Sequence, residues 1–199
     1  GLAAIPDSAF LESGPTTLTI PDTVTSIGSY AFQNNSNLAT VAIGRGASSI
    51  NYQAFFNDAA ITSLRSLGSA APSLGANSFG NTGSATFYRV ANANSWPSTI
   101  GAHAVVQVSP PSITSQPAAA SVTSGEQVSL SVTADPHTGG GILGYQWRKN
   151  GTNIVGATSN AFSIPTGTTS DAGSYSVVIT SWAGTVTSNS VTVSVTSGT

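Results

Sequence analysis

The segment Ile27-Gly28-Ser29-Tyr30-Ala31-Phe32 decides the fold of the first half of this chain, because similar segments return at a nearly constant spacing. The other copies are Ile5-Pro6-Asp7-Ser8-Ala9-Phe10, Ile50-Asn51-Tyr52-Gln53-Ala54-Phe55 and the weaker Leu74-Gly75-Ala76-Asn77-Ser78-Phe79. Their phenylalanines are separated by 22, 23 and 24 residues. Such a period predicts a solenoid, in which each unit buries its apolar face only by stacking on its neighbours.

A second apolar strip keeps the same period. It runs through Leu18-Thr19-Ile20, Val41-Ala42-Ile43, Ile61-Thr62-Ser63-Leu64 and Ala85-Thr86-Phe87. The alternation of Val41 and Ile43 indicates a short strand in each unit. Because equal positions of successive units superimpose, we expect the four rings of Phe10, Phe32, Phe55 and Phe79 to form one stacked and mostly buried row.

The pattern changes at Ser109-Pro110-Pro111, where two consecutive prolines indicate a linker. Beyond it, apolar residues alternate with period two, as in 128–132, 175–179 and 191–195. Seven short strands within about 85 residues predict a β-sandwich. We therefore expect a mainly β protein with two domains, residues 1–108 and 109–199.

The longer motif in residues 20–32, Ile-Pro-Asp-Thr-Val-Thr-Ser-Ile-Gly-Ser-Tyr-Ala-Phe, resembles the BspA-type leucine-rich repeat of bacterial surface proteins. The resemblance covers roughly residues 2–108 and implies a short solenoid of about four coils. It also implies a closing element after Phe87, made of a strand, a short helical turn with a tryptophan, and a last strand at 105–106. Trp96 is then expected to be a core residue of this cap.

Residues 171–177, Asp-Ala-Gly-Ser-Tyr-Ser-Val, are similar to the tyrosine-corner motif, with valine in place of cysteine. On this motif and on Trp147, the second half resembles an immunoglobulin-like domain of the cysteine-free bacterial branch. The resemblance implies that Trp147 is buried against Val132 and Val177, where a disulfide would otherwise lie. It also implies that the Tyr175 hydroxyl donates to backbone near residues 169–171.

Composition excludes several functions. Five basic and seven acidic residues give a net charge of −2, which is unsuited to tracking nucleic-acid phosphates. No apolar run is long enough to span a membrane, and the chain has no cysteine for a disulfide or thiolate metal site. The carboxylates show neither the clustering of a calcium loop nor a catalytic pair, so no cofactor and no metal are expected.

The two histidines, His103 and His137, are the remaining candidates for catalytic groups. Asp135-Pro136-His137-Thr138 places an acid, an imidazole and a hydroxyl together, but three glycines follow, which indicates a solvated loop rather than a preorganised site. His103 lies among apolar residues of the expected cap. We therefore expect no catalytic residue and no enzyme activity.

The functional hypothesis is a non-catalytic fragment of a bacterial cell-surface or secreted protein, with a role in adhesion, protein recognition or scaffolding. The expected location is extracellular or at the cell surface, with any signal peptide or anchor outside this sequence. The partner would be a host or matrix protein or a glycan. A carbohydrate-binding module and a purely structural stalk segment remain alternatives.

Two surfaces are candidates for partner contact. The solenoid strands would expose Thr40, Ala42 and Thr62 over about 200 Å², given strands ~4.8 Å apart and about 10 Å long. This is well below the ~800 Å² per partner of a standard interface, so recognition there should be weak and multivalent. Trp182 should point outward or lie on a turn. There it packs on the end of its own domain, packs against the solenoid at the domain junction, or contacts a ligand.

The first repeat begins with no capping sequence before it. We expect apolar residues such as Leu2, Ile5 and Leu18 to face solvent at this end. Two explanations stay open, a missing upstream portion of the parent protein or a weak self-association contact.

Overall fold

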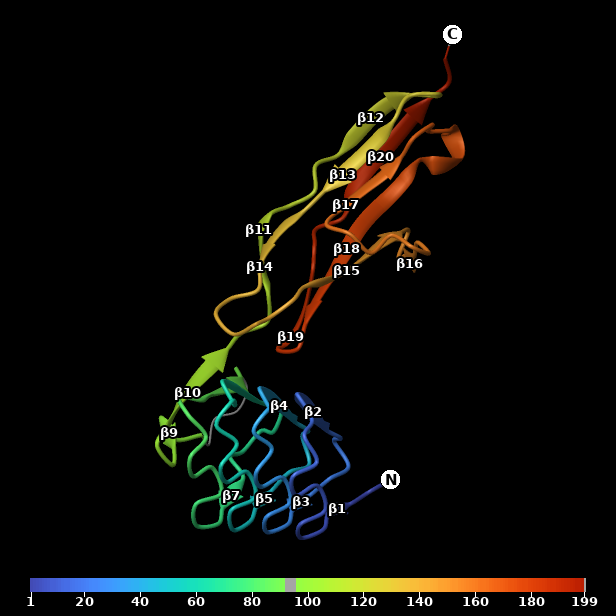
Figure 1. Ribbon diagram of the computed structural model, residues 1–199. Coiled ribbons are helices and arrows are strands. Elements are labelled where there is room, and N and C mark those ends of the chain that lie inside the picture. The colour runs from blue at the N-terminus through green and yellow to red at the C-terminus, as the bar shows by residue number, and fades with distance from the viewer. Residues whose placement is uncertain (92–95, 199) are drawn as a thin grey trace. The chain divides into compact units, whose positions relative to one another are not determined.

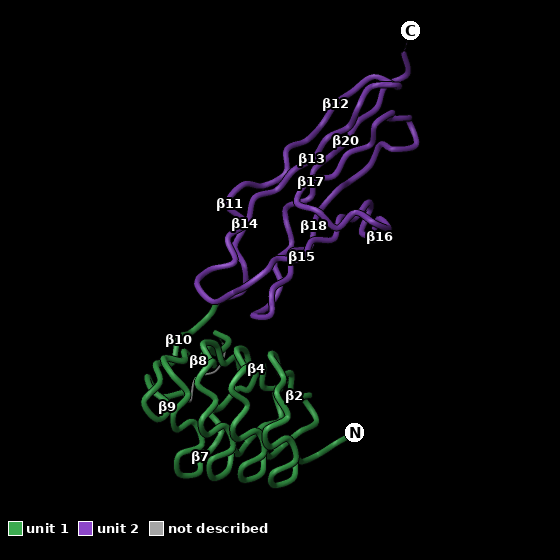
Figure 2. The backbone as a smooth tube through the Cα atoms, viewed as in Figure 1, with its two compact units in different colours: residues 1–108 green, residues 109–199 purple. Residues whose placement is uncertain are grey.

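A computed structural model describes residues 1–91 and 96–198 of the chain (Figure 1). The chain separates into two compact units, Gly1–Val108 and Ser109–Thr199 (Figure 2). Regular structure in the described residues is β-strand, apart from one short 3₁₀ turn. Ser, Thr and Val outnumber the strong helix formers in this sequence, and this composition favours strands.

The first unit contains two ladders of parallel strands (Figure 1). The shorter ladder has the order β1-β3-β5-β7 and the longer ladder the order β2-β4-β6-β8-β10, with β9 antiparallel to β10. The bounds of the short ladder are β1 Ala4–Ile5, β3 Ser26–Ile27, β5 Ser49–Ile50 and β7 Ser73–Leu74. Those of the long ladder are β2 Thr17–Ile20, β4 Thr40–Ile43, β6 Ser63–Ser66, β8 Thr86–Val90, β9 Thr99–Ile100 and β10 His103–Val108.

Strand register follows the sequence period. Ile5 pairs with Ile27, which pairs in turn with Ile50. In the longer ladder Leu18 of β2 pairs with Val41 of β4. Val41 pairs in turn with Leu64 of β6, and Leu64 pairs with Phe87 of β8. Each apolar position thus meets its counterpart one repeat later, and the inward side chains form a single core cluster.

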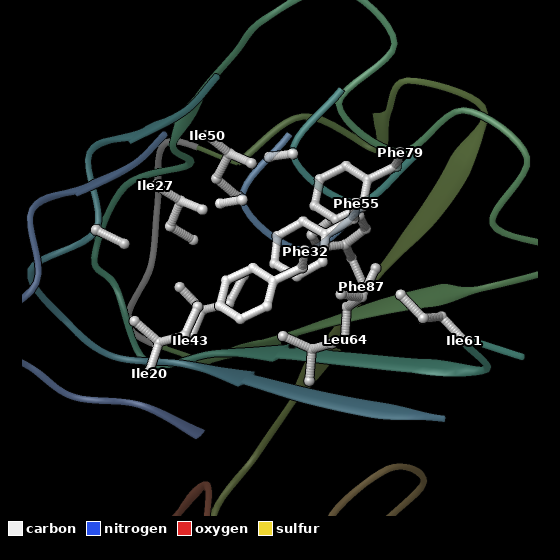
Figure 3. Close-up of a cluster of buried hydrophobic side chains, with 14 of the residues drawn as sticks. Ile20, Ile27, Phe32, Ile43, Ile50, Phe55, Ile61, Leu64, Phe79 and Phe87 are labelled. Atoms are coloured by element: carbon white, nitrogen blue, oxygen red, sulfur yellow. The ribbon is translucent and has the colours of Figure 1, made fainter. Parts of the chain in front are cut away.

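The four phenylalanines form the predicted stacked row, of which Figure 3 shows Phe32, Phe55 and Phe79. Ring centroids of Phe10 and Phe32 lie 5.1 Å apart, those of Phe32 and Phe55 5.1 Å, and those of Phe55 and Phe79 5.2 Å, with nearly parallel planes. Phe32, Phe55 and Phe79 are buried, but Phe10 is 44% exposed. The expectation of burial was wrong for Phe10, because Phe32 covers one face of its ring and no described residue stacks on the other.

The loops that carry these rings need left-handed backbone at two positions each. In the second repeat these are Tyr30 (φ +60°) and Asn34 (φ +62°). The second position is again asparagine at Asn57 and Asn81. Asparagine tolerates this region better than most residues, since its short polar side chain bonds locally. The loops therefore turn sharply enough to place one ring per repeat.

Strands β8, β9 and β10 close the first unit. β10 runs parallel to β8 with Val105 opposite Phe87, and it turns back onto β9. Trp96 is buried in the core cluster, at the position expected for a cap residue. Of the short helical turn predicted to contain this tryptophan, residues 92–95 lie outside the described residues.

The second unit contains a large sheet and two short strand pairs. The large sheet has the order β12-β20-β18-β15-β16, with β19 also paired to β18, and the pairs are β13–β17 and β11–β14. The first bounds are β11 Ser112–Ser115, β12 Ala120–Thr123, β13 Val128–Ser131, β14 Thr133–Asp135, β15 Gly144–Lys149 and β16 Thr152–Asn153. The others are β17 Ala161–Ile164, the 3₁₀ turn η1 Thr169–Asp171, β18 Gly173–Ser181, β19 Gly184–Thr187 and β20 Val191–Thr196.

Trp147 lies fully buried in the core of the second unit. It is opposite Val177 across the β15–β18 pair, and Val132 belongs to the same buried cluster. Its indole Nε1 donates to the Ser159 carbonyl at 2.9 Å. The Tyr175 hydroxyl donates to the Asp171 carbonyl at 2.8 Å, as the tyrosine-corner resemblance implies.

Candidate interaction surfaces

The outer face of the long ladder contains the residues predicted to contact a partner. Thr40 and Ala42 alternate with the buried Val41 and Ile43 of β4, so they face away from the core. Thr62 is exposed and directly precedes β6. These small side chains offer little contact area by themselves.

The same face contains two larger side chains that sequence reasoning overlooked. Ala42 is in register with Arg65 of β6, and Arg65 is in register with Tyr88 of β8. Val106 of β10 continues this row beside Tyr88. The 23-residue period counted from Ala42 leads to 65 and then 88, so the signal was present in the sequence. Arginine and tyrosine are frequent anchors in protein interfaces.

Trp182 lies on the turn between β18 and β19, one of the two positions predicted for it. The side chain is half-buried, and its Nε1 donates to the Gly139 carbonyl at 2.7 Å. Gly139 belongs to the loop after β14 in the same unit. This geometry corresponds to packing on the end of its own domain.

The two histidines have different environments. Asp135 contacts His137 through the His137 backbone N–H, 2.7 Å from Oδ1, and not through the imidazole. His137 and Thr138 are both exposed. His103 is buried, with Nε2 3.0 Å from the Thr82 hydroxyl and its ring near Phe79 and Phe87.

Asp58 is a buried carboxyl group with a strongly raised pKa. It is fully buried, and its Oδ1 accepts from the Asn35 backbone N–H at 2.7 Å. Its Oδ2 has no hydrogen-bond partner among the described residues. Burial raises the pKa of Asp58 to about 7, against the opposing effect of the Asn35 bond. Asn35 occupies the same position one repeat earlier, and its side-chain amide donates to the Phe10 and Phe32 carbonyls.

At the N-terminal end of the ladders, Leu2, Phe10 and Leu11 are exposed. The expectation for Ile5 was wrong, because it packs into the core and is only 5% exposed. Leu18 is half-buried against the same cluster. The exposed apolar residues at this end are therefore Leu2, Phe10 and Leu11, of which only Leu2 was named in the prediction.

Within residues 1–91 and 96–198, no three His, Cys, Asp or Glu side chains gather in a way that could hold a metal ion. The same described residues form no helix that is long and apolar enough to cross a membrane.

Comparison with known families agrees with this architecture. The sequence model of the BspA-type leucine-rich repeat region matches residues 3–114 in six copies, and the chain belongs to this family. An immunoglobulin-domain model matches residues 110–181, and the chain has no cysteine. Both are typically interaction modules rather than catalysts, and both are commonly extracellular or surface-associated. No curated protein sequence matched the chain.

Solved structures similar to the chain include immunoglobulin domains. A structure of tandem Ig repeats of Dlar aligns with 20% identity and a TM-score of 0.40, over 48% of this chain and 57% of that one. The titin M4 domain aligns with 22% identity and a TM-score of 0.39, over 46% of this chain and 100% of that one. The titin M3 domain aligns with 20% identity and a TM-score of 0.38, over 44% of this chain and 97% of that one.

Proposed function

We propose that the chain is a non-catalytic recognition fragment of a bacterial surface or secreted protein. The leucine-rich repeat unit, a short solenoid of about four coils, is the binding domain, and the immunoglobulin-like domain is a spacer. The supporting observation is the row Ala42, Arg65, Tyr88 and Val106, which places an arginine beside an aromatic ring on an otherwise small-residue face. The partner is a host or matrix protein.

The size of this face indicates weak binding at each site. Five strands about 4.8 Å apart, each exposing roughly 15 Å of length, give about 350 Å². A standard interface needs ~800 Å² per partner. Strong attachment then requires several copies acting together, since linked weak sites gain avidity from their effective concentration.

An array of purified extracellular-matrix proteins and glycans tests this function. We expect retention on at least one matrix protein, and Tyr88→Ala should weaken it at least about ten-fold, the loss of one interface anchor. Tyr52→Ala is the matched control, because Tyr52 is a 41% exposed tyrosine outside the long ladder. Retention on glycans alone, or equal effects of the two variants, would contradict the proposal.

A further inference from the structure

Backbone hydrogen bonds connect each ring-bearing loop to the next one along the chain. The Phe10 N–H donates to the Ala31 carbonyl, Phe32 to Ala54, and Phe55 to Ser78, each at 2.8 Å. The residues two positions on either side of each phenylalanine make the same kind of bond, as Gln53 does to Ala76 and Asn57 to Gly80. Three donors at alternate residues thus form a regular interface between successive repeats.

The fourth loop has this donor edge without an acceptor. Among the described residues, none accepts a hydrogen bond from the backbone N–H of Asn77, Phe79 or Asn81. Asn77 and Asn81 are exposed, but Phe79 is only 7% exposed. An unpaired backbone donor in a nearly buried residue is rare and costs free energy. These N–H groups are therefore suited to donate hydrogen bonds to the backbone carbonyls of another polypeptide segment.

The unpaired edge results from a shortened fifth repeat. Thr99-Ile100 has the pattern of the Ser-Ile strands, but it pairs antiparallel with β10 instead of joining β7. Only two residues separate Ile100 from His103, whereas four separate Ile27 from Phe32. The chain thus turns away before it covers the fourth loop.

A cavity of about 340 Å³ lies between the fourth loop and this cap. Its described lining residues are Leu74, Gly75, Asn77, Ser78, Phe79, Gly80, Gly101, Ala102 and His103. A Cβ atom added at Gly101 would meet no atom within 4 Å, so this wall is open. The rings of Phe87 and His103 already approach Phe79 edge-on. The space therefore suits backbone and small side chains rather than a fifth stacked ring.

We propose that this cavity is a docking groove for a polypeptide segment of a partner protein, which adds to the fourth loop as the next repeat would. The segment has the chemistry of Val24–Ala31, a Ser-Ile-Gly strand followed by Ser29, Tyr30 and Ala31. Its alternate carbonyls accept from Asn77 and Phe79, and its glycine N–H donates to the Leu74 carbonyl. The bond from Gly75 N–H to the Ile50 carbonyl, 2.8 Å, is the template for the last contact.

A second copy of this chain is a poorer occupant than such a partner. Gly28 donates its N–H to the Ile5 carbonyl at 2.9 Å, but the first repeat has Pro6 at the equivalent position. Proline has no N–H, so the first repeat of another copy cannot make this bond. The same difference supplies a matched control peptide.

The experiment titrates the full chain with the capped peptide of residues 24–31 and follows its amide signals by NMR. We expect shifts at Asn77 and Phe79, and at least about five-fold weaker binding of the same peptide with proline in place of Gly28, the effect of one backbone hydrogen bond. Absence of shifts at millimolar peptide, or equal binding of the two peptides, would overturn the proposal.

Two variants of the chain locate the site. Ala102 and Ala104 are both exposed, but only Ala102 lines the groove. Ala102→Trp should fill the space and abolish peptide binding, whereas Ala104→Trp should bind as the unmodified chain does. Unchanged binding by a folded Ala102→Trp protein would place the peptide elsewhere.

Discussion

Asp58 shows how strongly the identity of one side chain affects the hydrogen bonding at an equivalent position of successive repeats. At this position one repeat earlier, the Asn35 amide accepts a hydrogen bond from the Gly14 backbone N–H and donates to the Phe10 and Phe32 carbonyls. A carboxylate can only accept, so it cannot make the donating bonds. When Asp58 is protonated, its hydroxyl supplies a donor again. The protonated form therefore suits the folded protein better than the charged form.

We predict that the first unit loses stability as the pH rises. The folded-state pKa of Asp58, about 7, lies above the ordinary value of 3.8, so the folded protein binds this proton more tightly. The stabilisation of the folded state by this proton is complete below about pH 4 and is lost as the pH rises through about 7. Asp58→Asn should remove this dependence and raise the melting temperature at pH 8. Melting curves between pH 4 and 8 measure it, and a variant with the same pH slope would contradict the assignment.

The elements of the first unit have little stability of their own. Strands of two residues, such as β3 and β5, cannot persist alone, and they depend on the ladder and on the rings behind them. The phenylalanine row supplies the apolar contact that holds successive loops together. Its interior rings have a neighbour on both faces, but Phe10 has a neighbour on one face only.

Two alanine substitutions along this row should therefore differ. Phe32→Ala removes a fully buried ring and should cost about 3–5 kcal/mol of unfolding free energy. Phe10→Ala removes a 44% exposed ring and should cost less than about 1.5 kcal/mol. Denaturant unfolding of both variants measures the difference. Equal losses would mean that the rings do not act as the row seen here.

At the scale of the whole molecule, the chain has two separate hydrophobic cores. One cluster draws its buried residues from 5–100, and the other draws its buried residues from 128–195. The prolines Pro110 and Pro111 lie between them. Separate cores of this kind form separate cooperative units.

We predict two unfolding transitions that respond to different substitutions. Asp58→Asn should shift only the transition of the first unit. Trp182→Ala removes the hydrogen bond to Gly139 and a half-buried ring, and it should lower the midpoint of only the second unit's transition by several degrees. Scanning calorimetry of the variants tests this. A single transition moved by both substitutions would show one cooperative unit, and an unchanged melting temperature for Trp182→Ala would contradict its packing role.

Much of the architecture could be predicted from the sequence by itself. The 22–24-residue spacing sets the register of both ladders and the stacking of the rings, because equal positions in successive repeats must superimpose. Period-two alternation identified strands of the second unit, and residues 171–177 located the bond between Tyr175 and Asp171. These features are local or periodic, so they need no knowledge of distant contacts.

Only the tertiary structure decided the features that depend on which neighbour is present. Phe10 has the same sequence context as Phe32, but it is exposed because no repeat covers its outer face. Arg65 and Tyr88 become one surface only when β6 and β8 pair. Thr99-Ile100 has a repeat-like sequence, but it pairs with β10 and leaves the fourth loop open. The physical reason is that burial and hydrogen bonding belong to pairs of segments, whereas a sequence pattern describes each segment alone.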